Sequence, residues 1–108
     1  MTTIEETTSM FKDVIEAADA PLENSVMFDL GEAGVIRIDG REVSNERIPA
    51  DLVLSTSADD FRALGAGQLD PMVAMVTGRL RLSNMVLAMR MRGPMLEMFK
   101  AARGNPRS

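Results

Sequence analysis

The apolar residues of this chain follow two different periods, and the change falls at Ser57. Before that residue, between positions 25 and 56, apolar and polar side chains alternate, so that Val26, Phe28 and Leu30 fall on one side. Alternation of this kind is typical of strands with one buried face. From Ser57 onward the apolar residues recur at intervals of three and four, which is typical of amphipathic helices. The pattern therefore predicts strands in the middle of the chain and helices after them.

Turn and cap residues give the boundaries of the elements in the first half. A 3.6-residue period over Thr3–Ala18 predicts an amphipathic helix. Gly31-Glu32-Ala33-Gly34 separates two alternating runs, which predicts a hairpin. Residues 41–48 are polar, as suits a strand at the edge of a sheet, and Asp51–Thr56 alternates again. We expect one domain over residues 1–108, with an N-terminal helix in 1–20, strands in 25–56, helices and one short strand in 57–103, and a frayed tail in 104–108.

The second half of the chain contains four helix starts, marked by cap residues or by proline. Between the second and the third, Arg79–Leu82 alternates basic and apolar residues, which predicts a short strand. Gly93-Pro94 is expected to interrupt the chain before the last helix. The four predicted helices begin at Ser57, Asp70-Pro71, Ser83-Asn84 and Met95, and the last of them ends near Arg103.

Seven of the ten methionines fall between Met72 and Met98, and the chain contains no His, Cys, Trp or Tyr. Methionine is flexible and polarisable, so a group of methionines suits a cavity or an interface that must adapt to its contents. Methionine also fills ordinary cores, and that alternative stays open at each position. The missing residue types include the commonest general base, the commonest soft metal ligands and the most reactive nucleophile. We therefore expect a binding protein that is not an enzyme, with no metal site and no cofactor.

The net charge of −4 hides an asymmetry along the chain. Residues 1–70 carry fifteen acidic and five basic side chains, whereas residues 71–108 carry one acidic and seven basic side chains. Packing of the basic part beside the acidic part would neutralise both. Alternatively, the basic part meets an anionic lipid surface, which attracts each Lys or Arg by about 1 kcal/mol. Nucleic acid is not an expected partner, because the protein is acidic overall and the arginines of residues 79–92 have no aromatic residues among them.

Residues 51–91 carry an ordered set of motifs. A strand opened by Asp51 is followed by Ser57-x-x-Asp60-Phe61-x-x-Leu64-x-x-Gly67. Next come Leu69-x-Pro71-x-x-Ala74-x-x-x-Gly78, the strand Arg79–Leu82, and then Asn84-Met85-x-Leu87-Ala88-Met89. In this order the motifs resemble the sterol carrier protein type 2 family of lipid-binding domains, and the order of elements agrees over nearly the whole chain.

The resemblance implies an α+β fold, in which a five-stranded, mostly antiparallel sheet has helices packed on one face and encloses an apolar tunnel. Such domains bind sterols, fatty acids, acyl-CoA esters or other lipids. By similarity, the wall of the tunnel would come from Phe61, Leu64, Met72, Met75, Val76, Leu82, Met85, Leu87, Met89, Met95 and Met98.

We therefore expect non-catalytic binding and carriage of an apolar ligand. The last helix is amphipathic and follows Gly93-Pro94, so it is expected to act as a lid, with Lys100 and Arg103 facing a lipid head group or transiently an anionic membrane. The alternative is an interaction module on the same fold, in which the Met-rich face packs against a second copy, as a homodimer, or against an enzyme partner.

Three further features bear on location and family type. The N-terminus lacks the basic start and apolar stretch of a signal peptide, and the longest apolar runs have five residues, far below a membrane span. Well-known eukaryotic members of the family end in a small–basic–leucine peroxisomal address, whereas this chain ends in Pro106-Arg107-Ser108. Family members often carry glycine where this chain has Ser83, so the turn there is expected to differ. We expect a cytoplasmic, stand-alone protein of the bacterial type.

Overall fold

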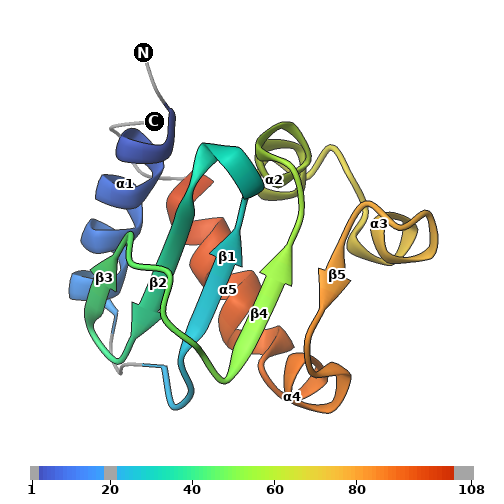
Figure 1. The fold of residues 1–108 in the computed structure, drawn as a ribbon. Helices are drawn as coiled ribbons and strands as arrows, with labels where there is room; N and C mark the ends of the chain where they lie inside the picture. The colour runs from blue at the N-terminus through green and yellow to red at the C-terminus, as the bar shows by residue number, and fades with distance from the viewer. Residues whose placement is uncertain (1–2, 19–21, 104–108) are drawn as a thin grey trace.

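The structure, a computed structural model, describes residues 3–18 and 22–103, apart from the side chains of Thr3, Phe99, Ala102 and Arg103. These residues form one sheet with helices behind it and at one of its edges (Figure 1). The tail expected at residues 104–108 lies outside the described residues. In chain order the elements are α1 (Thr3–Ala17), β1 (Val26–Asp29), the 3-10 helix η1 (Gly31–Ala33), β2 (Val35–Asp39), β3 (Glu42–Ser44), β4 (Leu52–Ser55), α2 (Ala58–Gly65), α3 (Pro71–Val76), β5 (Arg81–Leu82), α4 (Met85–Arg90) and α5 (Arg92–Arg103).

The five strands form a single sheet in the order β3-β2-β1-β4-β5. Three of the four pairings are antiparallel, and the exception is the parallel pair β1–β4. At the centre, Phe28 of β1 lies opposite Ile36 of β2 and Leu54 of β4, so the inward-facing side chains of three strands form one row. The predicted α+β fold, with a mostly antiparallel five-stranded sheet, is confirmed.

The hairpin between β1 and β2 depends on two glycines with positive φ. Residues 31–33 form η1, and Gly31 (φ 65°) and Gly34 (φ 119°) adopt backbone conformations that other residues rarely tolerate. The N–H of Leu30 donates to the carbonyl oxygen of Gly34 at 2.9 Å and closes the loop. The hairpin predicted at this position is confirmed.

One face of the sheet is crossed by the segment that joins β3 to β4, residues 45–51 (Figure 1). Arg37 of β2 holds this segment through two hydrogen bonds to its backbone. The Nε atom donates to the carbonyl oxygen of Ile48 at 3.2 Å, and Nη2 donates to that of Pro49 at 2.9 Å. The crossing segment lies on this face of the sheet, and the long helices lie on the other one.

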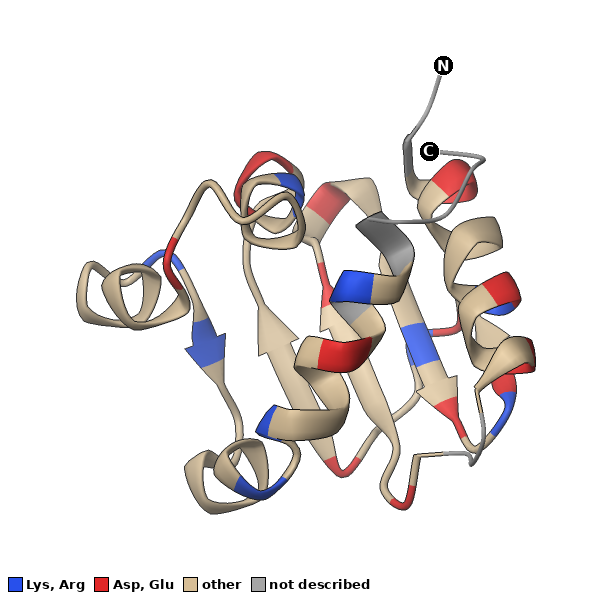
Figure 2. Cartoon of the chain, turned by 180° about the vertical axis from the view of Figure 1, so that it is seen from behind, with Lys and Arg blue, Asp and Glu red and all other residues tan. Residues whose placement is uncertain are grey.

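The opposite face packs against α1 and α5, which Figure 2 shows in front of the sheet. Its strands contribute five side chains that are at most 1% exposed: Val26, Phe28, Ile36, Ile38 and Leu52. Phe11 of α1 and Phe61 of α2 complete an aromatic group around Phe28, with ring centroids 5.7 Å and 5.0 Å from its own. Rings at these separations attract one another beyond the area they bury, so the aromatic group fixes α1 and α2 on the sheet.

Three of the helix starts predicted from cap residues are confirmed. In each, the cap side chain accepts a hydrogen bond from a backbone N–H of the first turn, which satisfies a group that has no partner inside the helix. The N–H of Asp60 donates to the side chain of Ser57, that of Met72 to Asp70, and that of Leu87 to Asn84.

The last helix begins earlier than the sequence predicts. Helix α5 starts at Arg92, so Gly93-Pro94 lies in its first turn and does not interrupt the chain. Met91 donates its N–H to Leu87 and accepts from Met95, both at 2.9 Å, so the hydrogen bonding continues from α4 into α5. The predicted interruption is wrong because first-turn N–H groups have no intrahelical partner, and proline therefore costs no hydrogen bond there.

Candidate functional site

The structure divides the eleven predicted wall residues into three groups. Four are buried, namely Phe61, Leu87, Met95 and Met98. Three are half-buried, namely Leu64, Met75 and Leu82. The remaining four are exposed on α3 and α4, namely Met72, Val76, Met85 and Met89. The buried members lie in one apolar cluster, whereas the exposed members lie on the two short helices that flank β5.

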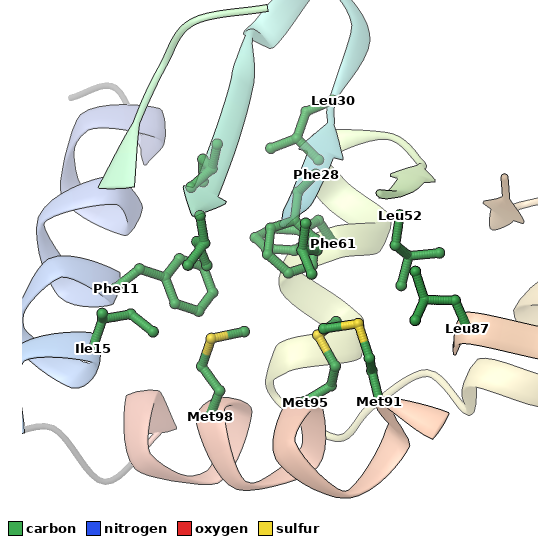
Figure 3. Close-up of a cluster of buried hydrophobic side chains, with 13 residues drawn as sticks. Phe11, Ile15, Phe28, Leu30, Leu52, Phe61, Leu87, Met91, Met95 and Met98 are labelled. Atoms are coloured by element: carbon green, nitrogen blue, oxygen red, sulfur yellow. The ribbon is translucent and has the colours of Figure 1, made fainter. Parts of the chain in front are cut away.

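The buried group lies between α5 and the inner face of the sheet. Figure 3 shows the side chains of Met91, Met95 and Met98 pointing from the helix towards Phe11, Phe61 and Leu52. The three methionines are 5 to 8% exposed, so their side chains fill the space at this layer boundary.

Met91 was missed among the wall residues, although it is buried. The sequence prediction interrupted the chain at Gly93-Pro94 and began the last helix at Met95, which left Met91 outside that helix. Its spacing of four and seven residues from Met95 and Met98 is the signal that would have found it, since residues at i, i+4 and i+7 share a helix face.

A small hollow lies at the other end of the cluster, near the N-terminus of α1. It is lined by Ile4, Thr7, Leu30, Ala33, Ala58, Phe61 and Arg62, and its volume of about 10 Å³ holds roughly one water molecule. Pockets for small-molecule ligands usually measure about 300 Å³ or more. This hollow therefore does not hold a lipid, and space for one between α5 and the sheet requires the methionines to move.

The exposed group is part of a larger set of exposed apolar side chains on α3 and α4. Six side chains on α3 and α4 are between 50 and 82% exposed, namely Met72, Val73, Val76, Met85, Val86 and Met89. Sequence reasoning did not include Val73 and Val86 among the wall residues. The missed signal is that both six-residue helices are apolar on nearly all sides, which normally marks a helix buried all round.

Basic side chains occur in the same stretch of the chain as these apolar residues. Residues 71–96 contain four arginines and no Asp or Glu. Arg79 pairs with Asp60, and the hydrogen bond from its guanidinium is the main reason that the pKa of Asp60 lies below its usual value. Arg81, Arg90 and Arg92 are exposed and form no ion pair within 3–18 and 22–103. We call these three arginines and the six exposed apolar side chains of α3 and α4 the α3–α4 surface.

The two predicted head-group residues lie on α5. Lys100 is exposed. The side chain of Arg103 lies outside the described residues. In the part of the chain that the structure describes, no group of three His, Cys, Asp or Glu side chains is placed to hold a metal ion. The helices found there are also too short or too polar to cross a membrane.

Comparison with known proteins finds a matching family model and similar solved structures. The family model described as the SCP-2 sterol transfer family matches residues 9–95. Among curated protein sequences, none matches this chain.

Solved structures with this fold carry the same family name. A crystal structure of sterol carrier protein 2 is similar with a TM-score of 0.64 at 16% identity, over 89% of this chain and 92% of that one. Sterol carrier protein 2 like 2 from Aedes aegypti gives 0.67 at 16% identity, over 82% and 92%. The apo form of sterol carrier protein 2 from Yarrowia lipolytica gives 0.58 at 22% identity, over 93% and 81%. At these identities the likeness shows that the fold is shared.

Proposed function

The chain belongs to the SCP-2 sterol transfer family, and we propose that it binds and carries an apolar lipid between α5 and the sheet. Fatty acids, acyl-CoA esters and sterols are the ligand classes we propose. The observation that carries the proposal is the row of three buried methionines, Met91, Met95 and Met98, at this layer boundary. A well-specified core favours Leu, Ile and Val, so three buried methionines, one just before α5 and two within it, suit a space that must repack.

Ligand entry would exchange contacts within the protein for contacts with the lipid. Methionine has an unbranched side chain with three rotatable bonds, so it can turn aside without moving the backbone far. Each Å² of apolar ligand surface removed from water contributes about 25 cal/mol to binding. Phe61 and Leu87 belong to the same buried cluster as the methionines and would then line the opened space. The half-buried Leu64, Met75 and Leu82 are not among the residues of that cluster, and they would line the space where it extends towards α3 and β5.

We propose that α5 acts as the lid of this space. Because Gly93-Pro94 lies inside the helix, the pivot would be Met91, the residue between α4 and α5. Lys100 on the exposed side of α5 would meet a carboxylate or phosphate head group, and Arg103 would do the same. The remaining predicted wall residues, which are exposed on α3 and α4, would lie outside the ligand space.

The proposed role is non-catalytic. The groups whose pKa is shifted support this view, because Asp29, Asp60 and Arg79 are each occupied by an ion pair with a structural role. A second candidate is a homodimer formed through the exposed side chains of α3 and α4, which their exposure favours.

Displacement of a fluorescent fatty acid from delipidated protein tests the main proposal, and native mass spectrometry of the protein as purified identifies a retained ligand. We expect saturable displacement with one ligand per chain. A protein that binds no fatty acid, acyl-CoA ester or sterol would contradict the proposal. Light scattering tests the second candidate, since a concentration-dependent dimer would favour it and a monomer at all concentrations would exclude it.

A further inference from the structure

The α3–α4 surface is not used by the proposed ligand space, and it combines two properties. Its six apolar side chains are at least half exposed, and its three arginines lack ion pairs with described residues. Both helices flank the edge strand β5, on the side of the sheet farthest from α1 (Figure 1). We propose that the α3–α4 surface docks the protein on anionic lipid bilayers. The proposal rests on the proposed function for its purpose, since docking would bring the carrier to the membrane that supplies its ligand.

The distribution of charge favours an anionic bilayer as the occupant. The protein carries a net charge of −4, so most of its surface is repelled by a negatively charged membrane. Residues 71–96 are the exception, because they carry four arginines and no acidic residue. Only Arg79 among these is neutralised by a described partner, Asp60. Attraction and repulsion would therefore orient the protein with this surface towards the membrane.

The shape and chemistry of the apolar side chains favour the same occupant. They project from two helices of six residues each, and α3 carries no charged side chain. A bilayer interface accepts side chains of unequal length without a matching surface, and helices bury their apolar side about 5–10 Å deep there. Arginines beside them can reach the lipid phosphates while their stems stay in the apolar layer.

A second copy of the chain fits this surface less well. A two-fold dimer uses the same surface on both subunits. Pairing through the α3–α4 surface would bring Arg81, Arg90 and Arg92 of both subunits into one interface. Like charges brought together at an interface are unfavourable, and no acidic residue in positions 71–96 would offset them.

Flotation with vesicles tests the proposal, using phosphatidylcholine vesicles with and without phosphatidylglycerol. Arg90→Gln should lower binding to the anionic vesicles about fivefold, because each arginine near such a surface contributes about 1 kcal/mol. Val86→Ser should lower it about tenfold through the loss of buried methyl groups. The matched controls are Lys12→Gln on α1 and Ile48→Ser on the crossing segment, both of which are exposed and outside the surface. Neither control should change binding by more than about twofold.

The proposal is overturned if the wild-type protein does not float with anionic vesicles, or if Lys12→Gln and Ile48→Ser weaken binding as much as the two test variants. It is also overturned if light scattering finds a dimer that Val86→Ser dissociates while vesicle binding is absent. Fatty-acid displacement in vesicle-free buffer separates this result from the proposed function. Variants that still bind the fluorescent fatty acid but no longer float with anionic vesicles would support docking. A wild-type protein that floats but binds no fatty acid, acyl-CoA ester or sterol would contradict the proposed function and leave docking supported.

Discussion

Arg79 holds Asp60 through two hydrogen bonds, from Nη2 to Oδ1 at 2.7 Å and from Nε to Oδ2 at 3.3 Å. The pair joins the start of α2 to the turn before β5, and Thr56 strengthens the link by donating its hydroxyl to the carbonyl oxygen of Arg79 at 2.8 Å. Helix α3 lies in the stretch of chain between these contacts, and its buried side chain is Ala74. The position of α3 therefore depends on Arg79 more than on packing.

Arg79→Gln should loosen α3 without unfolding the protein. The substitution removes the paired hydrogen bonds to Asp60, and few apolar contacts remain to hold the helix. We expect amide hydrogen exchange in residues 71–80 to become at least about tenfold faster, with unchanged exchange in β1 and β2. Arg62→Gln is the control, because Arg62 pairs with Asp59 within α2 and joins no separate elements. Equal exchange in both variants would show that α3 is held by other contacts.

The free energy of unfolding should fall at acid pH, because the carboxylates of Asp29 and Asp60 become protonated there. Hydrogen bonds from the N–H of Gly31 and from Arg47 lower the pKa of Asp29 below 3.8, and the bond from Arg79 lowers the pKa of Asp60 below the same value. Each carboxyl thus binds its proton less tightly in the folded chain than in the unfolded chain. Their contribution is complete above the unfolded value of 3.8 and is lost as the pH falls through the lower folded values.

Urea denaturation at a series of pH values measures this effect. The unfolding midpoint of the wild-type protein should drop steeply below about pH 4, and Asp29→Asn should make that drop shallower. Glu32→Gln is the matched control, since Glu32 is an exposed acidic residue of the neighbouring η1. A wild-type midpoint that stays constant through this range would contradict the assignment.

Replacing Met95 and Met98 with leucine should separate ligand binding from stability. Leucine has nearly the same volume, so the free energy of unfolding should change by less than about 1.5 kcal/mol per site. Its branched, shorter side chain turns aside less readily, so fatty-acid affinity should fall by about tenfold or more. The control is Met85→Leu with Met89→Leu, because these methionines are exposed. Unchanged affinity in the core variant would place the ligand elsewhere.

Gly93→Ala should not stabilise the protein, although the residue lies in the first turn of α5. Apart from the atoms of its chain neighbours, a methyl group at Gly93 meets no atom within 4 Å, but the next residue is Pro94. Proline disfavours the helical conformation of a preceding residue that carries a Cβ, and this cost opposes the higher helix propensity of alanine. Urea denaturation should therefore give an equal or lower free energy of unfolding, and a clearly stabilised variant would contradict this view.

Local chemistry explains which parts of the fold were predictable from sequence. Ser57, Asp70 and Asn84 act on N–H groups two or three residues away, so each helix start could be recognised from a short stretch of chain. The alternation around Phe28 likewise identified the inner face of the sheet. The parallel pairing of β1 with β4 joins residues 26 positions apart, as in Val26 with Leu52, and no local pattern specifies it. The resemblance to a known family supplied the fold class.

The candidate site was less predictable, because exposure depends on what packs against a residue. Met72 and Met95 look alike in the sequence, because each is followed by a second methionine three positions later. Nevertheless, the side chain of Met72 is 64% exposed, whereas that of Met95 is 8% exposed. The difference arises because α5 crosses the sheet, whereas α3 lies beyond its edge (Figure 1). Sequence periodicity gives the apolar side of a helix, but it does not say whether another layer covers that side.

The parallel pairing of β1 with β4 also affects the order in which the strands can pair while the chain is being synthesised. The β1–β2–β3 meander is complete once residue 44 has been made, but β1 keeps an unpaired edge until residues 52–55 follow. The inner face of the meander stays uncovered for longer, since α5, which packs on it, is the last element that the structure describes. At about 5–20 residues per second, the ribosome needs on the order of several seconds to add α5. During that interval Val26, Phe28 and Ile36 are available to chaperones, and an unpaired apolar strand edge is also prone to aggregation.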